Sequence, residues 1–227
     1  MVTPVTPDGA GLKAHWKLDE TSGLTAADSS GFGNKGTLTN MTGTEWTAGK
    51  LNGALKLTAA SSQHVVCGNG PSLQITGQLT VAAWVKMEEG NAGSYMGITG
   101  KLISGDYKGY ALVRHSSNVF RMWVASAGAT LGVSSDGIYT DAEWHHVAGV
   151  SKDGTNSLYI DGVKQAATLT SPFDESGDFA FIGKQYSTTN DRYWNGTIDD
   201  VRIYQRALSP EEMAGLAGLT APYDKSF

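Results

Sequence analysis

The chain lacks several features that would tie it to large classes of protein. It has a single cysteine, Cys67, so it forms no internal disulfide, and its position after His64 and two valines predicts a small buried residue. Charged residues make up only 17% of the sequence, the net charge is -5, and Lys and Arg form no cluster. A nucleic-acid footprint or an anionic membrane contact needs such a cluster, so neither is expected as a partner.

Long apolar runs are also missing. No segment reaches the ~18 consecutive apolar residues of a membrane helix, and the N-terminus has no apolar signal core. Residues 1–11 contain Thr-Pro repeats that are typical of a linker. We therefore expect a linker or a remnant of excision at 1–11, one folded domain at 12–219 and a loose tail at 220–227.

Glycine, by contrast, is abundant, with 29 residues. The glycines separate short runs of β-branched and aromatic residues, which is typical of strands joined by turns. Within Phe120–Val124, alternation places Arg121 and Trp123 on the face opposite to the apolar residues. Asp-Gly pairs at 153–154 and 161–162 predict tight hairpin turns.

The predicted strands are short and evenly spaced, which indicates an all-β, two-sheet antiparallel β-sandwich. One short C-terminal helix is predicted, because Ser209 and Pro210 are followed by Glu212, the pattern of an N-cap with a capping box. The strands are expected at 13–18, 53–57, 64–66, 79–87, 110–114, 119–125, 131–134, 145–152, 156–160, 180–183 and 196–204.

The stretch Gly196–Ser209 places two adjacent carboxylates, Asp199 and Asp200, inside a β-branched run. Carboxylates are depleted in strands and are rarely buried without a partner. Adjacent residues of a strand point to opposite faces, so at least one of the two is expected to face packed protein. That side chain then needs hydrogen-bond donors or a cation.

This stretch is one of four segments that resemble the laminin G-like domains of the concanavalin A-like lectin and glucanase superfamily. The resemblance follows one order from His15 to about Leu216, and it implies a jelly-roll sandwich used mostly for recognition. The other three segments are His15-Trp-Lys-Leu-Asp-Glu-Thr-Ser-Gly23, Trp144-His-His-Val-Ala148 and Leu158-Tyr-Ile-Asp-Gly162.

The resemblance also implies a metal. Glucanases of this superfamily carry a similar Asp-x-Val-Arg-Val-Tyr run whose Asp binds a structural calcium, which places that role on Asp199, with Asp200 at the intervening position. A glycine-rich loop offers further oxygens from Asp28 and Asn34, and calcium takes six to eight oxygen ligands. We expect these four residues to bind one calcium. The alternative is that Asp28 and Asn34 form Asx turns and Asp199 accepts backbone hydrogen bonds.

Signatures of catalysis are missing. The glucanases of this fold carry paired carboxylates at alternate positions of one strand, and glycoside hydrolysis needs such a pair. The adjacent acids here, such as Glu88 and Glu89, lie beside turns. His145 and His146 point to opposite faces of a strand, so they do not chelate one zinc together, and no Gly-x-Ser-x-Gly elbow occurs. We expect no enzyme.

The remaining functional signal is aromatic. Sugars stack their C–H faces on flat rings and hydrogen-bond to planar polar side chains, and the polar segment 183–194 is rich in both. The expected ligand contacts are Arg121, Trp123, Tyr186, Asn190, Arg192 and Tyr193. The alternative for Trp123 is that it only fills the second side of the sandwich under a loop.

We therefore expect a non-catalytic, lectin-like module that binds a glycan or polysaccharide and is stabilised by calcium. The module would be monomeric and would belong to a larger secreted or cell-surface protein, beside other domains. A protein–protein adhesion domain or structural spacer is the alternative, and a cryptic lyase or glycosidase is a third possibility. The solvent exposure of Trp123, Tyr186 and Tyr193 distinguishes the first two.

Overall fold

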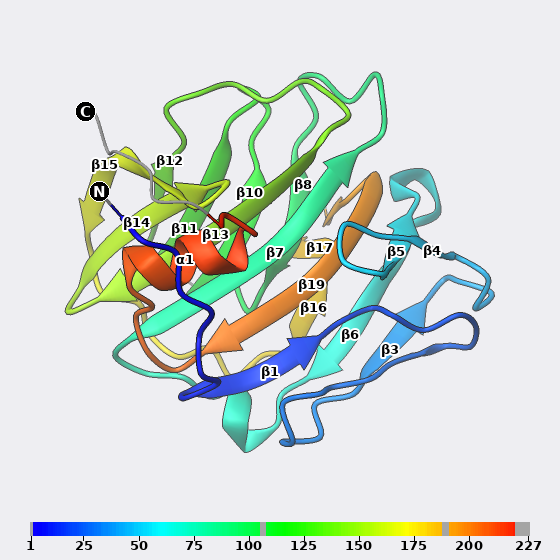
Figure 1. Ribbon diagram of the computed structural model, residues 1–227, viewed down its shortest axis with the longest axis horizontal. Coiled ribbons are helices and arrows are strands. Elements are labelled where there is room, and N and C mark those ends of the chain that lie inside the picture. The colour runs from blue at the N-terminus through cyan, green and yellow to red at the C-terminus, as the bar shows by residue number, and fades with distance from the viewer. Residues whose placement is uncertain (1, 105–107, 188–190, 221–227) are drawn as a thin grey trace.

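The computed structural model describes residues 2–104, 108–187 and 191–220. Two antiparallel sheets face each other and enclose the main core (Figure 1). The described residues contain one α-helix, α1 Pro210–Leu216, and two short 3-10 helices, η1 Ala59–Ser61 and η2 Pro71–Leu73. This is the predicted sandwich with one C-terminal helix.

The first sheet, in the foreground of Figure 1, has eight strands over the described residues. Their order is β15, β14, β13, β7, β19, β5 and β4, with β1 also paired to β19. The strands are β1 Leu12–Trp16, β4 Trp46–Ala48, β5 Gly53–Leu57, β7 Leu79–Met87, β13 Trp144–Lys152, β14 Thr155–Ile160, β15 Val163–Thr170 and β19 Gly196–Tyr204.

The second sheet also has eight strands over the described residues, in the order β12, β11, β10, β8, β16, β6, β3 and β2. It packs behind the first sheet in Figure 1. The strands are β2 Thr25–Ala26, β3 Gly36–Thr39, β6 His64–Gly68, β8 Met96–Gly100, β10 Gly109–Arg114, β11 Phe120–Ser126, β12 Ala129–Ser134 and β16 Ala180–Ile182.

A small third sheet covers part of the second sheet. A Cβ atom at Gly97 of β8 would lie only 2.1 Å from the backbone nitrogen of Gln185. Met96 and Ile98 point into the core, so Gly97 faces outward and the small sheet lies on the outer face of β8. Its strands are β9 Ile103–Ser104, β17 Lys184–Ser187 and β18 Arg192–Tyr193, with β17 parallel to β9 and antiparallel to β18.

The core between the two large sheets contains the residues that alternation predicts to point inward. Phe120 and Met122 of β11 are fully buried there. Trp16 and Trp194 are also fully buried, and the Trp16 indole nitrogen donates to the carbonyl of Asn34 at 2.6 Å. Cys67 is a buried free thiol, as predicted.

Helix α1 lies on the outer face of the first sheet, where Met213 and Leu216 pack on a second apolar cluster (Figure 1). The predicted capping box is present, with Ser209 as the N-cap. The N-terminal segment runs beside the helix, since the Val5 amide donates to the Glu211 carbonyl at 2.9 Å. The described part of the expected linker at 1–11 therefore contacts the domain, and the tail beyond 220 lies outside the described residues.

The two predicted Asp-Gly turns are present. Asp153 and Asp161 have φ of 50° and 51°, and the following glycines also have positive φ, as two-residue hairpin turns of type I′ require. No helix among the described residues is long and apolar enough to span a membrane.

Candidate functional site

The acidic pair in β19 sits on a β-bulge. The register between β19 and β7 shifts between Asp199 and Arg202, and Asp200 takes a left-handed φ of 48°. Ile198 and Val201 both face the core, so two residues lie between consecutive inward positions. The expectation that the two carboxylates point to opposite faces is therefore wrong, because the extra residue of a bulge lets both point to the outer face.

Asp199 is completely buried under the turn that joins β4 to β5. Its Oδ2 accepts a hydrogen bond from the Leu51 amide at 2.7 Å, whereas its Oδ1 is buried without a partner among the described residues. Burial raises the pKa of Asp199 to about 7, and the charges of Asp200 and Asp19 add to this. A buried carboxylate oxygen without a donor is the observation here that fits a cation.

Asp200 already has partners. Its Oδ1 accepts from His15 Nε2 at 2.7 Å and from the Arg202 guanidinium at 3.0 Å. Burial alone would raise the pKa of Asp200, but His15 and Arg202 together hold it below its usual value. The side chain is therefore committed to an ion-pair cluster on the outer face of the first sheet.

Asp28 and Asn34 form a hydrogen-bonded turn. Oδ1 of Asp28 accepts from the amides of His15 and Ser30, and Oδ2 accepts from the Asn34 amide and the Ser30 hydroxyl, at 2.8–3.0 Å. Burial raises the pKa of Asp28, but these donors outweigh it and lower the pKa. The Asn34 side chain bonds to the Lys13 carbonyl and to Ser72.

The four expected calcium ligands therefore occupy three separate settings. Within the ranges the structure describes, no group of three or more His, Cys, Asp or Glu side chains is placed to bind a metal. Both oxygens of Asp28 and Oδ1 of Asp200 accept hydrogen bonds, and Asp199 is the one of the three carboxylates with a fully buried oxygen that lacks a partner among the described residues. The calcium expectation stays a prediction, with its best support at Asp199.

The expected sugar face lies on the outer side of the second sheet. Trp123 and Arg121 are partly buried and point away from the core, as alternation predicts. A Cβ atom at Gly132 of the neighbouring β12 would lie 2.5 Å from Cδ1 of Trp123. The indole thus packs against the backbone of β12, where only glycine leaves room for it.

Tyr95 and Arg192 complete this cluster. The Tyr95 ring centroid lies 5.4 Å from that of Trp123, and Cζ of Arg192 lies 4.1 Å from the Tyr95 centroid and 5.6 Å from the Trp123 centroid. His115 packs edge-on against Tyr95 at 5.0 Å. We refer to Tyr95, His115, Arg121, Trp123 and Arg192 as the aromatic cluster.

Residues 184–193, within the polar segment 183–194, form a hairpin over their described ends. Lys184 pairs with Tyr193 and Gln185 with Arg192. The ring centroid of Tyr193 lies 5.6 Å from that of His64, and its hydroxyl donates to Asp191. The side chain of Tyr186 and the whole of Asn190 lie outside the described part of the chain.

A hollow of about 450 Å³ lies beside the hairpin, lined by residues that include Tyr95, Arg192 and Tyr193. This is within the usual range of ligand sites. Arg114 fixes its wall, since Nη1 donates to the carbonyls of Asn91 and Ser94 at 3.0 and 2.9 Å and so holds the loop that leads to Tyr95. Sequence reasoning missed Tyr95, although a lone tyrosine in a Gly-Ser loop is a usable signal.

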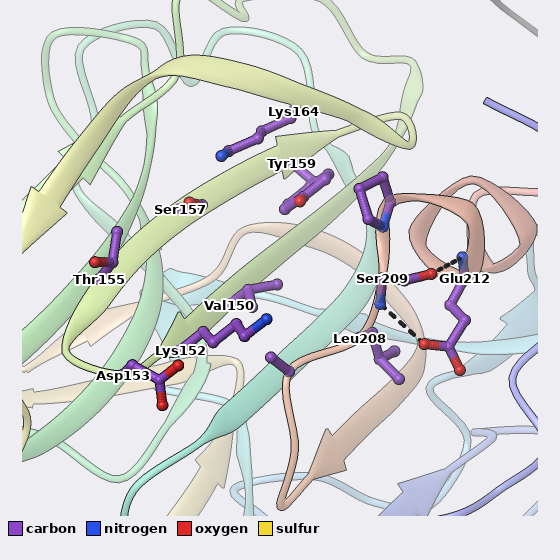
Figure 2. A pocket seen from close by; sticks show the side chains of 12 residues that line it. Val150, Lys152, Asp153, Thr155, Ser157, Tyr159, Lys164, Leu208, Ser209 and Glu212 are labelled. Carbon is purple, nitrogen blue, oxygen red and sulfur yellow. Dashed lines mark hydrogen bonds between the residues drawn. The ribbon is translucent and has the colours of Figure 1, made fainter. Parts of the chain in front are cut away.

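A larger hollow of about 520 Å³ lies on the opposite side of the molecule, between β13, β14 and the start of α1 (Figure 2). Lys152 and Lys164 lie at its rim, and Ser209 and Glu212 close one end through the capping box (Figure 2). Among the described residues that line it, the one aromatic ring is Tyr159, which is only 5% exposed. This groove therefore presents no flat ring for a sugar, in contrast to the aromatic cluster.

Comparison with solved structures supports the fold assignment. Domain 4 of AbnA, an extracellular GH43 arabinanase from Geobacillus stearothermophilus solved with arabinotriose, matches with a TM-score of 0.73 and 24% identity over 92% of this chain and 98% of that one. The binding domain of Paraclostridial Mosquitocidal Protein 1 matches with a TM-score of 0.71 and 14% identity over 91% of this chain. This chain spans 52% of the length of that binding-domain chain.

A sialidase from Trypanosoma rangeli, solved with a difluoro-KDN ligand, matches with a TM-score of 0.65 and 16% identity over 96% of this chain and 36% of that one. At these identities the likeness concerns the fold. No curated protein matches the sequence.

The family assignment comes from the sequence itself. The model of the concanavalin A-like lectin/glucanases superfamily matches residues 59–214, well over half of the chain. The two facing antiparallel sheets agree with it. The protein is a member of the concanavalin A-like lectin/glucanase superfamily, as its laminin G-like segments predict.

Proposed function

We propose that this protein is a non-catalytic carbohydrate-binding module that holds a glycan at the aromatic cluster. The observation that carries the proposal is the Trp123 indole, which packs on the strand backbone with Tyr95 and Arg192 at its side. Aromatic rings of this kind supply large apolar faces for stacking, with polar groups nearby to fix orientation. The sugar-bound state of the similar arabinanase domain supports the same reading.

The charges around the hollow support binding rather than hydrolysis. Among the described residues that line it, Asp191 is the one carboxylate, and it pairs with Lys184 at 2.8 Å. Glycosidases need two carboxylates on either side of the scissile bond. We further propose that the protein is monomeric and that it is a module of a secreted or cell-surface protein. The second part is supported by the similar domain, which belongs to an extracellular arabinanase.

The test is a glycan array followed by calorimetry with Trp123→Ala. We expect Trp123→Ala to abolish measurable binding with little loss of stability, because partly exposed aromatic anchors dominate binding. Trp16→Ala is the matched control and should cost ~3–5 kcal/mol of stability, because it empties a buried core site. If Trp123→Ala destabilises as much as Trp16→Ala, or if no glycan binds, the adhesion or spacer role replaces this proposal.

We also propose that calcium binds at Asp199, with Asp19 as the nearby second carboxylate. The support is the buried Oδ1 of Asp199, which has no donor, and the charge of Asp19 close enough to raise the Asp199 pKa. Calcium at this position would neutralise the buried charge and tie β19 to the turn between β4 and β5.

The calcium test compares Asp199→Asn with Asp28→Asn by thermal melting in calcium and in chelator. Wild-type protein should melt higher in calcium, by ~2.7 kcal/mol at a hundredfold excess over Kd. Asp199→Asn should lose this response, and Asp28→Asn should keep it despite a lower baseline. Loss of the calcium response in both variants would instead support one calcium site shared by Asp28 and Asp199. No calcium response in the wild type would exclude a bound structural calcium.

A further inference from the structure

Among the described residues, the side-chain hydrogen-bond partners of two arginines of the aromatic cluster are neutral. Nε of Arg121 donates to the Ser134 hydroxyl at 2.7 Å, and Nη1 of Arg192 donates to the Gln185 side-chain oxygen at 2.6 Å. Across the described ranges, no carboxylate lies within ion-pair distance of either guanidinium. This contrasts with Arg202 and Arg206, each of which pairs with an acidic side chain.

The two guanidiniums act on the same small region. Arg192 stacks over Tyr95, and Arg121 lies two residues from Trp123 on the same face of β11. Burial lowers the pKa of His115, and both arginines lower it further. The two guanidiniums therefore make the local electrostatic potential positive, although the whole chain carries a net charge of -5.

A polar atom in the cluster is also left without a partner. The Tyr95 hydroxyl is buried and has no hydrogen-bond partner among the described residues. Burial raises its pKa, so the hydroxyl stays protonated and can donate. Within the described part of the chain, the site thus combines a flat ring, a buried hydroxyl without a partner and two guanidiniums that have no carboxylate partner.

We propose that the aromatic cluster selects sugars that carry a carboxylate, which Arg121 and Arg192 bind while the sugar ring packs on Trp123. Guanidinium and carboxylate groups match in charge and in planar geometry, which makes arginine the preferred residue for this recognition. This inference rests on the proposed carbohydrate-binding function and narrows it to acidic glycans. The carboxylate can come from a uronic acid within a polysaccharide or from a terminal sialic acid.

The experiment uses two matched pairs of probes in titration calorimetry. Tetragalacturonate is compared with its methyl ester, and sialyllactose is compared with lactose. We expect one carboxylated probe to bind about tenfold or more tightly than its neutral match, and the pair that shows the preference identifies the source. The preference should weaken as salt is raised, because charge interactions are screened.

Variants then assign the preference to the arginines. Arg192→Gln and Arg121→Gln should each remove most of this preference, measured as the ratio of the affinities for the carboxylated and the neutral probe, and Arg192→Lys should retain part of it. Lys164→Gln, at the groove on the opposite sheet, should leave it unchanged. Circular dichroism and melting curves confirm that each variant is folded.

Failures of the two proposals are distinguishable. If a neutral glycan binds through Trp123 and neither carboxylated probe is preferred, carbohydrate binding stands and the acidic selectivity is wrong. The selectivity is also wrong if the preference survives both Arg→Gln changes. If wild-type protein binds no probe and no glycan of the array, both proposals fail.

Discussion

His145 and His146 are adjacent in β13 and have opposite electrostatic surroundings. His145 bonds to Asp161 at 2.9 Å and to Asp141 at 3.0 Å; burial lowers its pKa, but these two carboxylates raise it overall. His146 lies on the other face, packed against Trp84, and burial lowers its pKa to about 4. One histidine therefore holds a turn through hydrogen bonds to two carboxylates, while the other is neutral at pH 7. The structural role of both stays a prediction.

His115 offers a residue-scale test of the acidic-glycan proposal. Burial, Arg121 and Arg192 lower its pKa in the free protein. A bound carboxylate would neutralise part of the arginine field, so the pKa of His115 should rise on binding. NMR titration of the imidazole with and without tetragalacturonate or sialyllactose measures the shift. A neutral sugar is the control, and an unchanged pKa with the carboxylate bound would place that carboxylate away from the arginines.

At the scale of elements, the fit between β11 and β12 sets the position of the Trp123 ring. Gly132→Ala would place a methyl group 2.5 Å from Cδ1 of Trp123 and so would displace the indole. Gly132 has an ordinary strand conformation, and alanine in a strand is favoured over glycine by roughly 0.5–1 kcal/mol. We therefore expect weaker glycan binding with little loss of stability.

Calorimetry and melting curves of Gly132→Ala provide the measurement. Gly128→Ala, in the turn before β12, is a control that meets no atom within 4 Å but has a positive φ of 84°. It should reduce stability and spare binding, the opposite pattern. Undiminished binding by Gly132→Ala would mean that the indole position does not matter for the ligand.

Sequence predicts well those strands whose own residues are typical of strands. The bounds of β5, β7 and β19 agree with the prediction, because most of their residues are apolar or β-branched. Strand β8, Met96–Gly100, was missed because its glycines are typical of turns. It is a strand because β10 and β16 pair with it on either side, which is tertiary information.

The candidate site shows the same difference between what local sequence predicts and what depends on tertiary contacts. Alternation alone placed Trp123 and Arg121 outward, and the structure confirms this. Tyr95 could not be placed, because its loop is held by Arg114, about twenty residues later in the sequence. The Asp199–Asp200 bulge was also missed, since a bulge depends on the register with β7 rather than on the β19 sequence alone.

For the whole molecule, Asp199 predicts how stability depends on pH. Its pKa is raised from 3.8 to about 7 on folding. Between these values the folded state holds a proton that the unfolded state has lost, so without metal the Asp199 contribution to stability falls as pH rises through this window. Calcium requires the ionised carboxylate, so its stabilising effect should grow over the same window.

Urea unfolding at pH 5, 6 and 7.5, in chelator and in calcium, measures both trends. The difference in the free energy of unfolding between wild type and Asp199→Asn reports on Asp199 alone. Asp28 and Asp200 have lowered pKa values, so the stability that they contribute is lost only as pH falls through the acid range. In chelator, the free energy of unfolding of Asp199→Asn should exceed that of the wild type near neutral pH. A constant difference at every pH would show that Asp199 does not titrate in this window.

The placement of helix α1 and the N-terminal segment has a practical consequence for presentation on a surface. Val5 bonds to Glu211 of the helix, and both lie on the outer face of the first sheet, whereas the aromatic cluster is on the outer face of the second. A tether attached near residue 2 therefore leaves from the side away from the proposed ligand. Anchored at that end to a sensor chip or bead, the sandwich would point its indole outward, giving uniform orientation without blocking capture.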